Sequence, residues 1–292
     1  MPRRSRRLAA TVATALATVA LGCVPAPPPT PGPVIPGDPG PADLRFEVDT
    51  TLDRHSISPY IYGSNANRDI VGNGLTMLRL GGNRWTAYNW ENNASNAGSD
   101  WCFQNDSYLA GSTTAGEAVR PTVQTATANG AAALVTVPIV DHVAADHNGG
   151  SGPPECSGDV RKSGSGYLTT RFEANVADKP GALSTTPDVS DGTVYQEEFV
   201  AWLKATAPGA NVWFSLDNEP DLWADTHAEI HPSAVRYDEL AERSIRFAKA
   251  IKSAWPAAKV TGPASYASTA SNDSRTPPTP AGATSSTGTS AR

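Results

Sequence analysis

The chain has 292 residues, with 29 acidic and 23 basic side chains, and its formal charge is −6. This length suits one large domain or two small ones. The acidic balance argues against nucleic acid as a partner, whereas neutral and cationic substrates stay compatible with it.

The first 23 residues have the pattern of an export signal. Four arginines precede an alanine-rich apolar core at 8–21, which is too short for a confident membrane span. Cys23 follows Ala-Leu-Gly at 20–22, in part like a lipoprotein cleavage box, so a lipid on Cys23 and simple cleavage nearby both stay open. We expect a secreted or cell-surface protein of bacterial-type export, in contact with a membrane only through such a lipid.

Low-complexity sequence follows the signal and also ends the chain. Proline and glycine dominate residues 24–43, as in an extended linker. The tail after Tyr266 has no large apolar residue and cannot bury enough surface to offset its ordering entropy. We therefore expect a folded domain at 44–265 and a disordered tail at 266–292.

Strand and helix signals alternate inside this domain. Residues 45–49 alternate like an exposed strand, and 131–141 form a continuous apolar run, as in a strand buried on both faces. Further short strand signals lie at 60–65, 75–83, 212–220 and 259–265. Apart from 45–49, these runs predict an α/β fold in which five parallel strands are covered by helices.

Two helices are expected between the later strands. The first, at 194–209, has apolar residues at helical spacing, a capping-box pattern at Thr193 and Gln196, and a Pro-Gly end. The second, at 231–255, is amphipathic and has Pro232 near its start.

Two cysteines remain besides Cys23. Cys102 and Cys156 form an even pair in polar loops of an exported protein, which indicates a disulfide. Two unpaired, partly buried thiols are the alternative.

Polar residues mark three strand ends. Glu219 lies just past the fourth of the five strands, and Asn83 and Asp141 end two others, so the three belong at one edge of the sheet. The surrounding loops are rich in amides and aromatic residues, which suit a neutral carbohydrate: Trp85, Tyr88, Trp90, Trp101, Trp213 and Trp223. Trp202 lies on a helix face and is better explained by packing.

A metal site at "HAEIH" is a weaker hypothesis. His227 and His231 are four residues apart, but Glu229 is two residues from each and would point away on a helix. Pro232 also indicates that the helix begins only after His231, so we expect no metal ligands here.

Several motifs together resemble glycoside hydrolase family 44. They are "ISPYIYGSN", "LRLGGNRWTAYNWENNASNAGSDW", "VPIVDHVAAD", "SDGTVYQEEFVAWL" and "FSLDNEPDLWADTHAEIHP", and they span about 44–266 in order. The resemblance implies a retaining endo-β-1,4-glucanase or xyloglucanase that acts on plant cell-wall β-glucan and requires no cofactor; a structural metal ion stays open. It also implies a (β/α)8 TIM-type barrel with a small β-sandwich, to which 45–51 would contribute a strand.

The resemblance further assigns site residues. The glutamate of the Asn-Glu-Pro motif, Glu219, would be the general acid/base, and Asn218 would bond the sugar 2-hydroxyl. The other expected substrate contacts are Trp85, Tyr88, Trp90, Glu91, Asn83 and Trp223.

The second carboxylate of such a site is the open question. The family's nucleophile ends the seventh barrel strand, whereas Glu229, Glu239 and Glu242 all precede the fifth. The resemblance ends near 262–263, so we expect about five of the eight barrel strands, no nucleophile in this chain and no activity of the chain as given. A non-catalytic β-glucan-binding remnant is the alternative.

Overall fold

The computed structural model describes residues 44, 46, 48–65, 73–149 and 155–266. The predicted signal peptide and linker, and the tail after Tyr266, lie outside these residues. The chain divides into two units, 1–55 and 56–292. In the first unit the described residues form no strand, and Phe46 and Val48 are exposed. The strand expected at 45–49 is therefore not found at its described positions, because no partner strand covers its apolar side chains.

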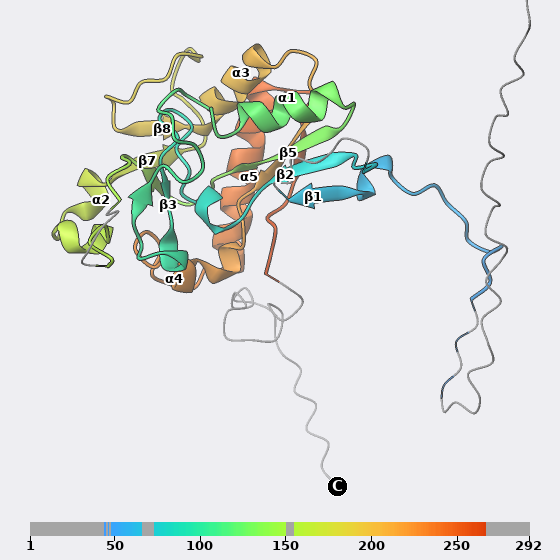
Figure 1. The fold of residues 1–292 in the computed structure, drawn as a ribbon, viewed down its shortest axis with the longest axis horizontal. Helices are drawn as coiled ribbons and strands as arrows, with labels where there is room; N and C mark the ends of the chain where they lie inside the picture. The colour runs from blue at the N-terminus through green and yellow to red at the C-terminus, as the bar shows by residue number, and fades with distance from the viewer. Residues whose placement is uncertain (1–43, 45, 47, 66–72, 150–154, 267–292) are drawn as a thin grey trace, which may run out of the picture. The chain divides into compact units, whose positions relative to one another are not determined.

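The second unit is built on a parallel sheet whose five strands follow chain order (Figure 1). This sheet confirms the α/β prediction and all five expected parallel strands. The strands are β1 (Gly63–Asn65), β2 (Met77–Leu80), β5 (Ala132–Val137), β9 (Val212–Leu216) and β10 (Lys259–Thr261).

Strand register separates two faces of this sheet. Leu80, Val135 and Phe214 are paired in one row and are buried. The neighbouring row consists of Arg79, Leu134 and Trp213, which are only partly buried. Because side chains alternate along a strand, these rows point to opposite faces.

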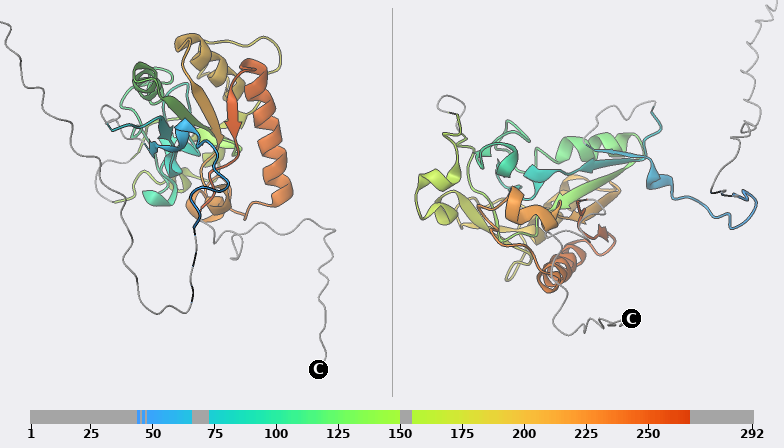
Figure 2. Two further views of the ribbon diagram at one scale, coloured as in Figure 1. Left: turned by 90° about the vertical axis from the view of Figure 1, so that its right-hand side faces the viewer. Right: turned by 90° about the horizontal axis from the view of Figure 1, so that it is seen from below.

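Three helices cover the buried face: α1 (Arg120–Ala128), α3 (Gln196–Thr206) and α5 (Tyr237–Ala254). Contacts join α1 to β2 and β5, α5 to β9, and α3 to α5, and Figure 2 shows α3 and α5 on the same side of the sheet. None of the helices in the described ranges has the length and hydropathy of a membrane span.

Both predicted helices exist, but their beginnings were predicted wrongly. Thr193 lies in strand β8 (Thr193–Tyr195), and Tyr195 precedes α3 without a side-chain cap, so the capping box does not form. Helix α5 begins at Tyr237, because the residues after Pro232 are irregular. Helix α1 was not predicted.

The remaining elements are short and lie mainly in the long connections. They are η1 (Pro59–Ile61), η2 (Asn83–Trp85), β3 (Ser95–Asn96), η3 (Gly98–Asp100), β4 (Asn105–Asp106), β6 (His142–Ala144), η4 (Val160–Ser163), α2 (Tyr167–Thr170), β7 (Phe172–Val176), η5 (Pro220–Leu222) and α4 (Trp223–Thr226). Strands β3 and β4 pair with each other, and β6, β7 and β8 form a third sheet.

Candidate active site

The residues after β9 adopt an unusual backbone. Asp217 and Glu219 have φ of 65° and 50°, in the left-handed region that non-glycine residues rarely adopt. Three bonds hold Asp217 there: its carboxylate accepts from Thr86 Oγ1 at 2.6 Å and from the amides of Ile139 and Asn218, each at 2.7 Å. Burial raises the pKa of Asp217, and these hydrogen bonds act against that rise. Strain of this kind persists where surrounding contacts enforce it, often at functional sites.

Asn218 follows β9, and its side chain connects the end of β2 to Glu219. Its side-chain oxygen accepts from Arg79 Nη2 at 2.7 Å and from the amide of Gly82 at 3.0 Å. Its Nδ2 donates to Glu219 Oε2 at 3.1 Å. Glu219 is partly exposed, and its amide donates to the Ala264 carbonyl at 2.7 Å. The carboxylate is thus fixed by its neighbour at the carboxyl edge of the sheet, as expected.

A cleft of about 660 Å³ adjoins this edge, and both Gly82 and Asn83 line it. Trp85 lines it too but is only 6% exposed, whereas Trp101 is 49% exposed and Tyr108 is 75% exposed. Aromatic surface available to a ligand is therefore supplied mainly by Trp101 and Tyr108. Tyr108 was not among the predicted contacts, although an aromatic residue in the polar run "NDSYL" could have indicated one.

An arginine orders the outer wall of this cleft. Arg84 Nη1 lies 2.5 Å from Asp106 Oδ1, and its guanidinium lies 4.3 Å from the centre of the Tyr108 ring. All three residues line the cleft. Arg84 therefore packs on the π face of the Tyr108 ring, and the charge of Arg84 is balanced by Asp106.

Three of the aromatic residues that we expected to contact sugar are buried, so these predictions were wrong. Tyr88, Trp90 and Trp223 are each 0% exposed. Trp90 stacks on Phe199 with ring centres 5.9 Å apart, and Trp223 packs against His231 at 5.0 Å. These aromatic residues belong to the core, so they offer no ring face to a sugar.

Glu91 is likewise buried, at 3% exposure, and cannot contact substrate directly. Burial is the main cause that raises its pKa to about 7, helped by Glu173 and two other acidic neighbours and opposed by the amide of Asp188. Burial raises the pKa of Glu173 to about 7 as well. These two carboxylates interact with each other, and among the described residues their hydrogen-bond partners are the amides of Asp188 and Asn89.

Asp141, the third polar strand end, has a different partner. Arg243 from α5 donates to both of its carboxylate oxygens, at 2.6 and 2.7 Å. The hydrogen bonds from Arg243 lower the pKa of Asp141. Asp141 therefore closes an ion pair with α5.

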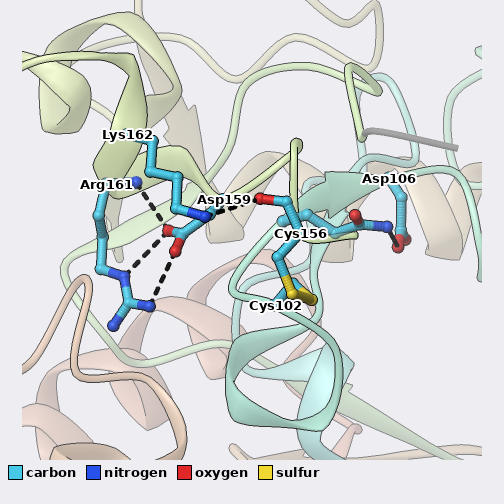
Figure 3. Close-up of a disulfide and its surroundings, with 7 residues drawn as sticks. Cys102, Asp106, Cys156, Asp159, Arg161 and Lys162 are labelled. Atoms are coloured by element: carbon cyan, nitrogen blue, oxygen red, sulfur yellow. Dashed lines mark hydrogen bonds and ion pairs between the residues drawn. A yellow bond between two sulfur atoms is a disulfide. The ribbon is translucent and has the colours of Figure 1, made fainter. Parts of the chain in front are cut away.

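Cys102 and Cys156 are bonded, which confirms the predicted disulfide (Figure 3). Cys102 directly follows Trp101, and Cys156 lies near η4, where Asp159 and Arg161 form an ion pair. The bond therefore ties the loop that carries the cleft tryptophan to a second, charged loop.

The two histidines of "HAEIH" have separate partners. His227 contacts Glu229 and the Asn83 carbonyl, whereas His231 contacts Glu239 at 2.9 Å. Within the described ranges, His, Cys, Asp and Glu side chains form no group of three or more that could hold a metal.

The chain matches the family model described as glycoside hydrolase family 44 over residues 94–286. It belongs to glycoside hydrolase family 44. The match runs beyond residues 262–263, where the resemblance was expected to end.

Named relatives agree with this membership. The chain is 39% identical over 236 residues to a beta-mannanase/endoglucanase A of Caldicellulosiruptor saccharolyticus. A Paenibacillus polymyxa xyloglucanase of family 44, solved with xyloglucan, is 39% identical with a TM-score of 0.63. A family 44 endoglucanase produced by Clostridium acetobutylium is 35% identical with a TM-score of 0.67.

These matches cover most of this chain but only part of each relative. They span 76%, 72% and 77% of the chain, respectively, and 17%, 42% and 44% of the three relatives. The activities of the complete relatives therefore apply to this chain only as proposals.

Proposed function

We propose that this chain carries the acid/base side of a retaining, endo-acting glycoside hydrolase site for β-1,4-glucans, with Glu219 as general acid/base. The observation that carries the proposal is the arrangement at the end of β9, where Asn218 fixes Glu219 and also accepts from the amide of Gly82, a residue that lines the aromatic cleft. The five strands in chain order support a partial (β/α)8 barrel, whose chemistry belongs at this edge.

Glycoside cleavage with retention assigns two tasks to Glu219. Its carboxylic acid first protonates the leaving oxygen, and its carboxylate then removes a proton from the water that hydrolyses the glycosyl-enzyme. Asn218 holds the carboxylate through Nδ2. Once a sugar is bound, the same Nδ2 group is in a position to turn toward the 2-hydroxyl.

The reaction also needs a second carboxylate about 5–5.5 Å from the first. Glu91 and Glu173 belong to another acidic group, and Asp141 is paired with Arg243. We therefore assign the nucleophile to no carboxylate among the described residues. On this basis the 292-residue chain alone binds β-glucan but does not turn it over.

The substrate class follows from the cleft. Trp101 and Tyr108 present aromatic faces that suit the apolar faces of sugar rings, and the partly exposed Asn83 supplies an amide group for hydroxyls. We propose a neutral plant β-glucan such as xyloglucan as the partner. Export, with or without a lipid on Cys23, is part of the proposal and is supported by the disulfide, which suits an oxidising compartment.

The first experiment asks whether the 292-residue chain binds and cleaves glucan. Affinity for xyloglucan and reducing-sugar release from xyloglucan and carboxymethylcellulose would be measured on the same preparation. We expect binding without release. Sugar release would overturn the nucleophile assignment, and absence of binding would contradict the substrate class.

The second experiment tests Glu219 in a chain that has both carboxylates. The chain would be joined to the C-terminal barrel strands of a family 44 relative, and Glu219→Gln would be compared with Glu242→Gln, a matched change at an exposed position of α5. We expect Glu219→Gln to lower hydrolysis of natural glucans by a factor on the order of 10² to 10⁴. Substrates with a good leaving group should lose less in the first step, and azide should restore turnover. Equal activity of both variants would reject Glu219.

The non-catalytic alternative makes a different prediction for the joined chain. If the fold only binds glucan, the joined protein would bind xyloglucan without releasing sugar, and Glu219→Gln would leave its affinity unchanged. Recovery of hydrolysis that depends on Glu219 excludes this alternative.

A further inference from the structure

His227 is an ionisable side chain that the proposed reaction does not use. It lies directly after α4, and its ring is 0% exposed. Its Nδ1 lies 2.8 Å from Glu229 Oε1, and its Nε2 lies 2.9 Å from the Asn83 carbonyl oxygen. Glu229 is only 1% exposed. Both ring nitrogens therefore face oxygen atoms in a site without bulk water.

Hydrogen-bond chemistry restricts where protons can be in this pair. A carbonyl oxygen only accepts, so Nε2 must carry a hydrogen. The contact at Nδ1 then needs one more proton, either on the ring, facing an ionised Glu229, or on Glu229, facing a neutral ring. In both forms the two residues together have no net charge, which lowers the cost of burying them.

The electrostatic surroundings agree with a retained proton. Burial lowers the pKa of His227, but the hydrogen bond and charge of Glu229 outweigh it, with smaller contributions from the Asn83 carbonyl and from Asp217, so the net pKa is raised. Glu229 in turn interacts with the charge of Arg161. Its second oxygen, Oε2, is buried and has no hydrogen-bond partner among the residues that the structure describes.

The pair is connected to the proposed acid/base through a short turn. The Nε2–H group of His227 holds the carbonyl of Asn83, and the preceding residue, Gly82, donates its amide to the side chain of Asn218. Asn218 in turn donates to Glu219. A displacement of the Gly82–Asn83 turn would therefore move the Gly82 amide, and with it the Asn218 side chain that bonds the Glu219 carboxylate.

Close packing against Gly98 restricts the position of the His227 ring. A Cβ atom at Gly98 would collide with the Thr226 carbonyl and with Cε1 of His227, and Gly98 has φ of +53°. The glycine thus lets η3 approach the imidazole edge closely. The ring is clamped between η3 and the Gly82–Asn83 turn.

We propose that His227 and Glu229 are positioning residues: a buried, proton-sharing pair that holds the Gly82–Asn83 turn and, through Asn218, orients Glu219. The function of the pair rests on the proposed role of Glu219, but its chemistry does not. Measurements on the protonation and hydrogen bonding of the pair therefore succeed or fail independently of hydrolysis.

The test uses nuclear magnetic resonance of the full 292-residue chain labelled with ¹⁵N and ¹³C. In the parent protein we expect a proton on Nε2 of His227 and a second proton bound or shared at Nδ1 near pH 7. In Glu229→Gln the amide can donate to Nδ1, so the ring should be neutral, with a proton on Nε2 only. A parent ring that is neutral, with Nδ1 unprotonated and no proton on Glu229, would overturn the proposal, as would a cationic ring in Glu229→Gln.

Hydrogen exchange of the Gly82 amide tests the positioning. Glu229→Leu removes the partner of Nδ1, and we expect Gly82 exchange to rise about tenfold, as for the loss of one ordinary hydrogen bond, and the side-chain amide resonances of Asn218 to shift. Glu229→Gln should preserve both readouts. The control is Glu239→Leu, which removes the carboxylate that contacts His231 and Arg243, and it should leave hydrogen exchange of the Gly82 amide unchanged.

Two results would contradict the positioning role. One is a folded Glu229→Leu protein with the Gly82 exchange and the Asn218 side-chain resonances of the parent. The other is an equal response to Glu239→Leu, which would indicate general loosening. If Glu229→Leu does not fold, the ring protonation of the parent and of Glu229→Gln decides the proposal.

Discussion

Residues 83–97 and 98–109 follow each other in the chain, and both are rich in aromatic and amide side chains. The first stretch lies mostly in the core, whereas the second lines the cleft. In the first, amides bond internal groups: Tyr88 Oη donates to Asn93 Oδ1 at 2.9 Å, and Asn96 Nδ2 donates to Asn105 Oδ1 at 2.8 Å. In the second, Trp101 and Tyr108 stay exposed. Composition alone suggests sugar binding for both; satisfied internal hydrogen bonds identify the half that is structural.

The largest expected effect is on the core half. Trp90→Ala removes a fully buried indole that stacks on Phe199 and also contacts Trp202. We expect the free energy of unfolding to fall by about 3–5 kcal/mol, measured by urea denaturation. A loss below about 1 kcal/mol would contradict the assignment of Trp90 to the core.

The disulfide sharpens the comparison from the cleft half. Replacing Cys102 and Cys156 together by serine removes a link across 54 residues. We expect unfolding free energy to fall by about 2–4 kcal/mol and xyloglucan affinity to fall as well, because Trp101 loses its anchor. Calorimetry and binding on the variant and on reduced parent protein check both effects. A stability loss without any change in affinity would show that Trp101 is held by other contacts.

Glu91 gives the core half a pH signature. Its pKa is raised from 4.5 to about 7 in the folded protein, so between these values the folded state binds a proton that the unfolded chain has lost. Stability contributed by this group is therefore full below pH 4.5 and decreases as pH rises through about 7. Glu91→Gln should unfold at a higher temperature than the parent at pH 8, with a smaller difference at pH 5. Parallel curves for the two proteins would contradict the shift.

The smallest effect on stability is expected for Trp101→Ala. Half of this side chain is exposed, so unfolding free energy should change by about 0.5 kcal/mol or less. Xyloglucan binding should weaken about five- to tenfold if Trp101 is a main contact. The matched comparison is Trp90→Ala, in which stability changes most. Unchanged glucan affinity of Trp101→Ala would remove the cleft from the proposal.

The sequence predicted the sheet well because its strands are short apolar runs with polar ends. Five such runs became β1, β2, β5, β9 and β10, and the same logic placed Glu219 at a strand end. Helix starts were less predictable: Thr193 lies in a strand because Thr193 itself and the next two residues pair with β7. Tertiary pairing outweighed a local capping preference there.

The residue types in the sequence did not reveal which of the predicted site residues are buried. Tyr88 and Trp90 resemble sugar-stacking residues in the sequence, but they pack against α3 through Phe199, and α3 is more than 90 residues further along the chain. Arg79 could not be assigned to Asn218 either, since the bond joins strands separated by β5. Such contacts depend on strand order and register, which local patterns do not specify.

The bonds around Asn218 also constrain how the molecule folds. The bond from Arg79 spans 139 residues, and the bond from Thr86 to Asp217 spans 131. Neither can form until β2, β5 and β9 are aligned, and a slip of one residue would turn Arg79 to the opposite face of the sheet. Contacts of such sequence separation form slowly during folding. Refolding chains should therefore regain helical signal early and acquire the geometry around Glu219 among their last steps.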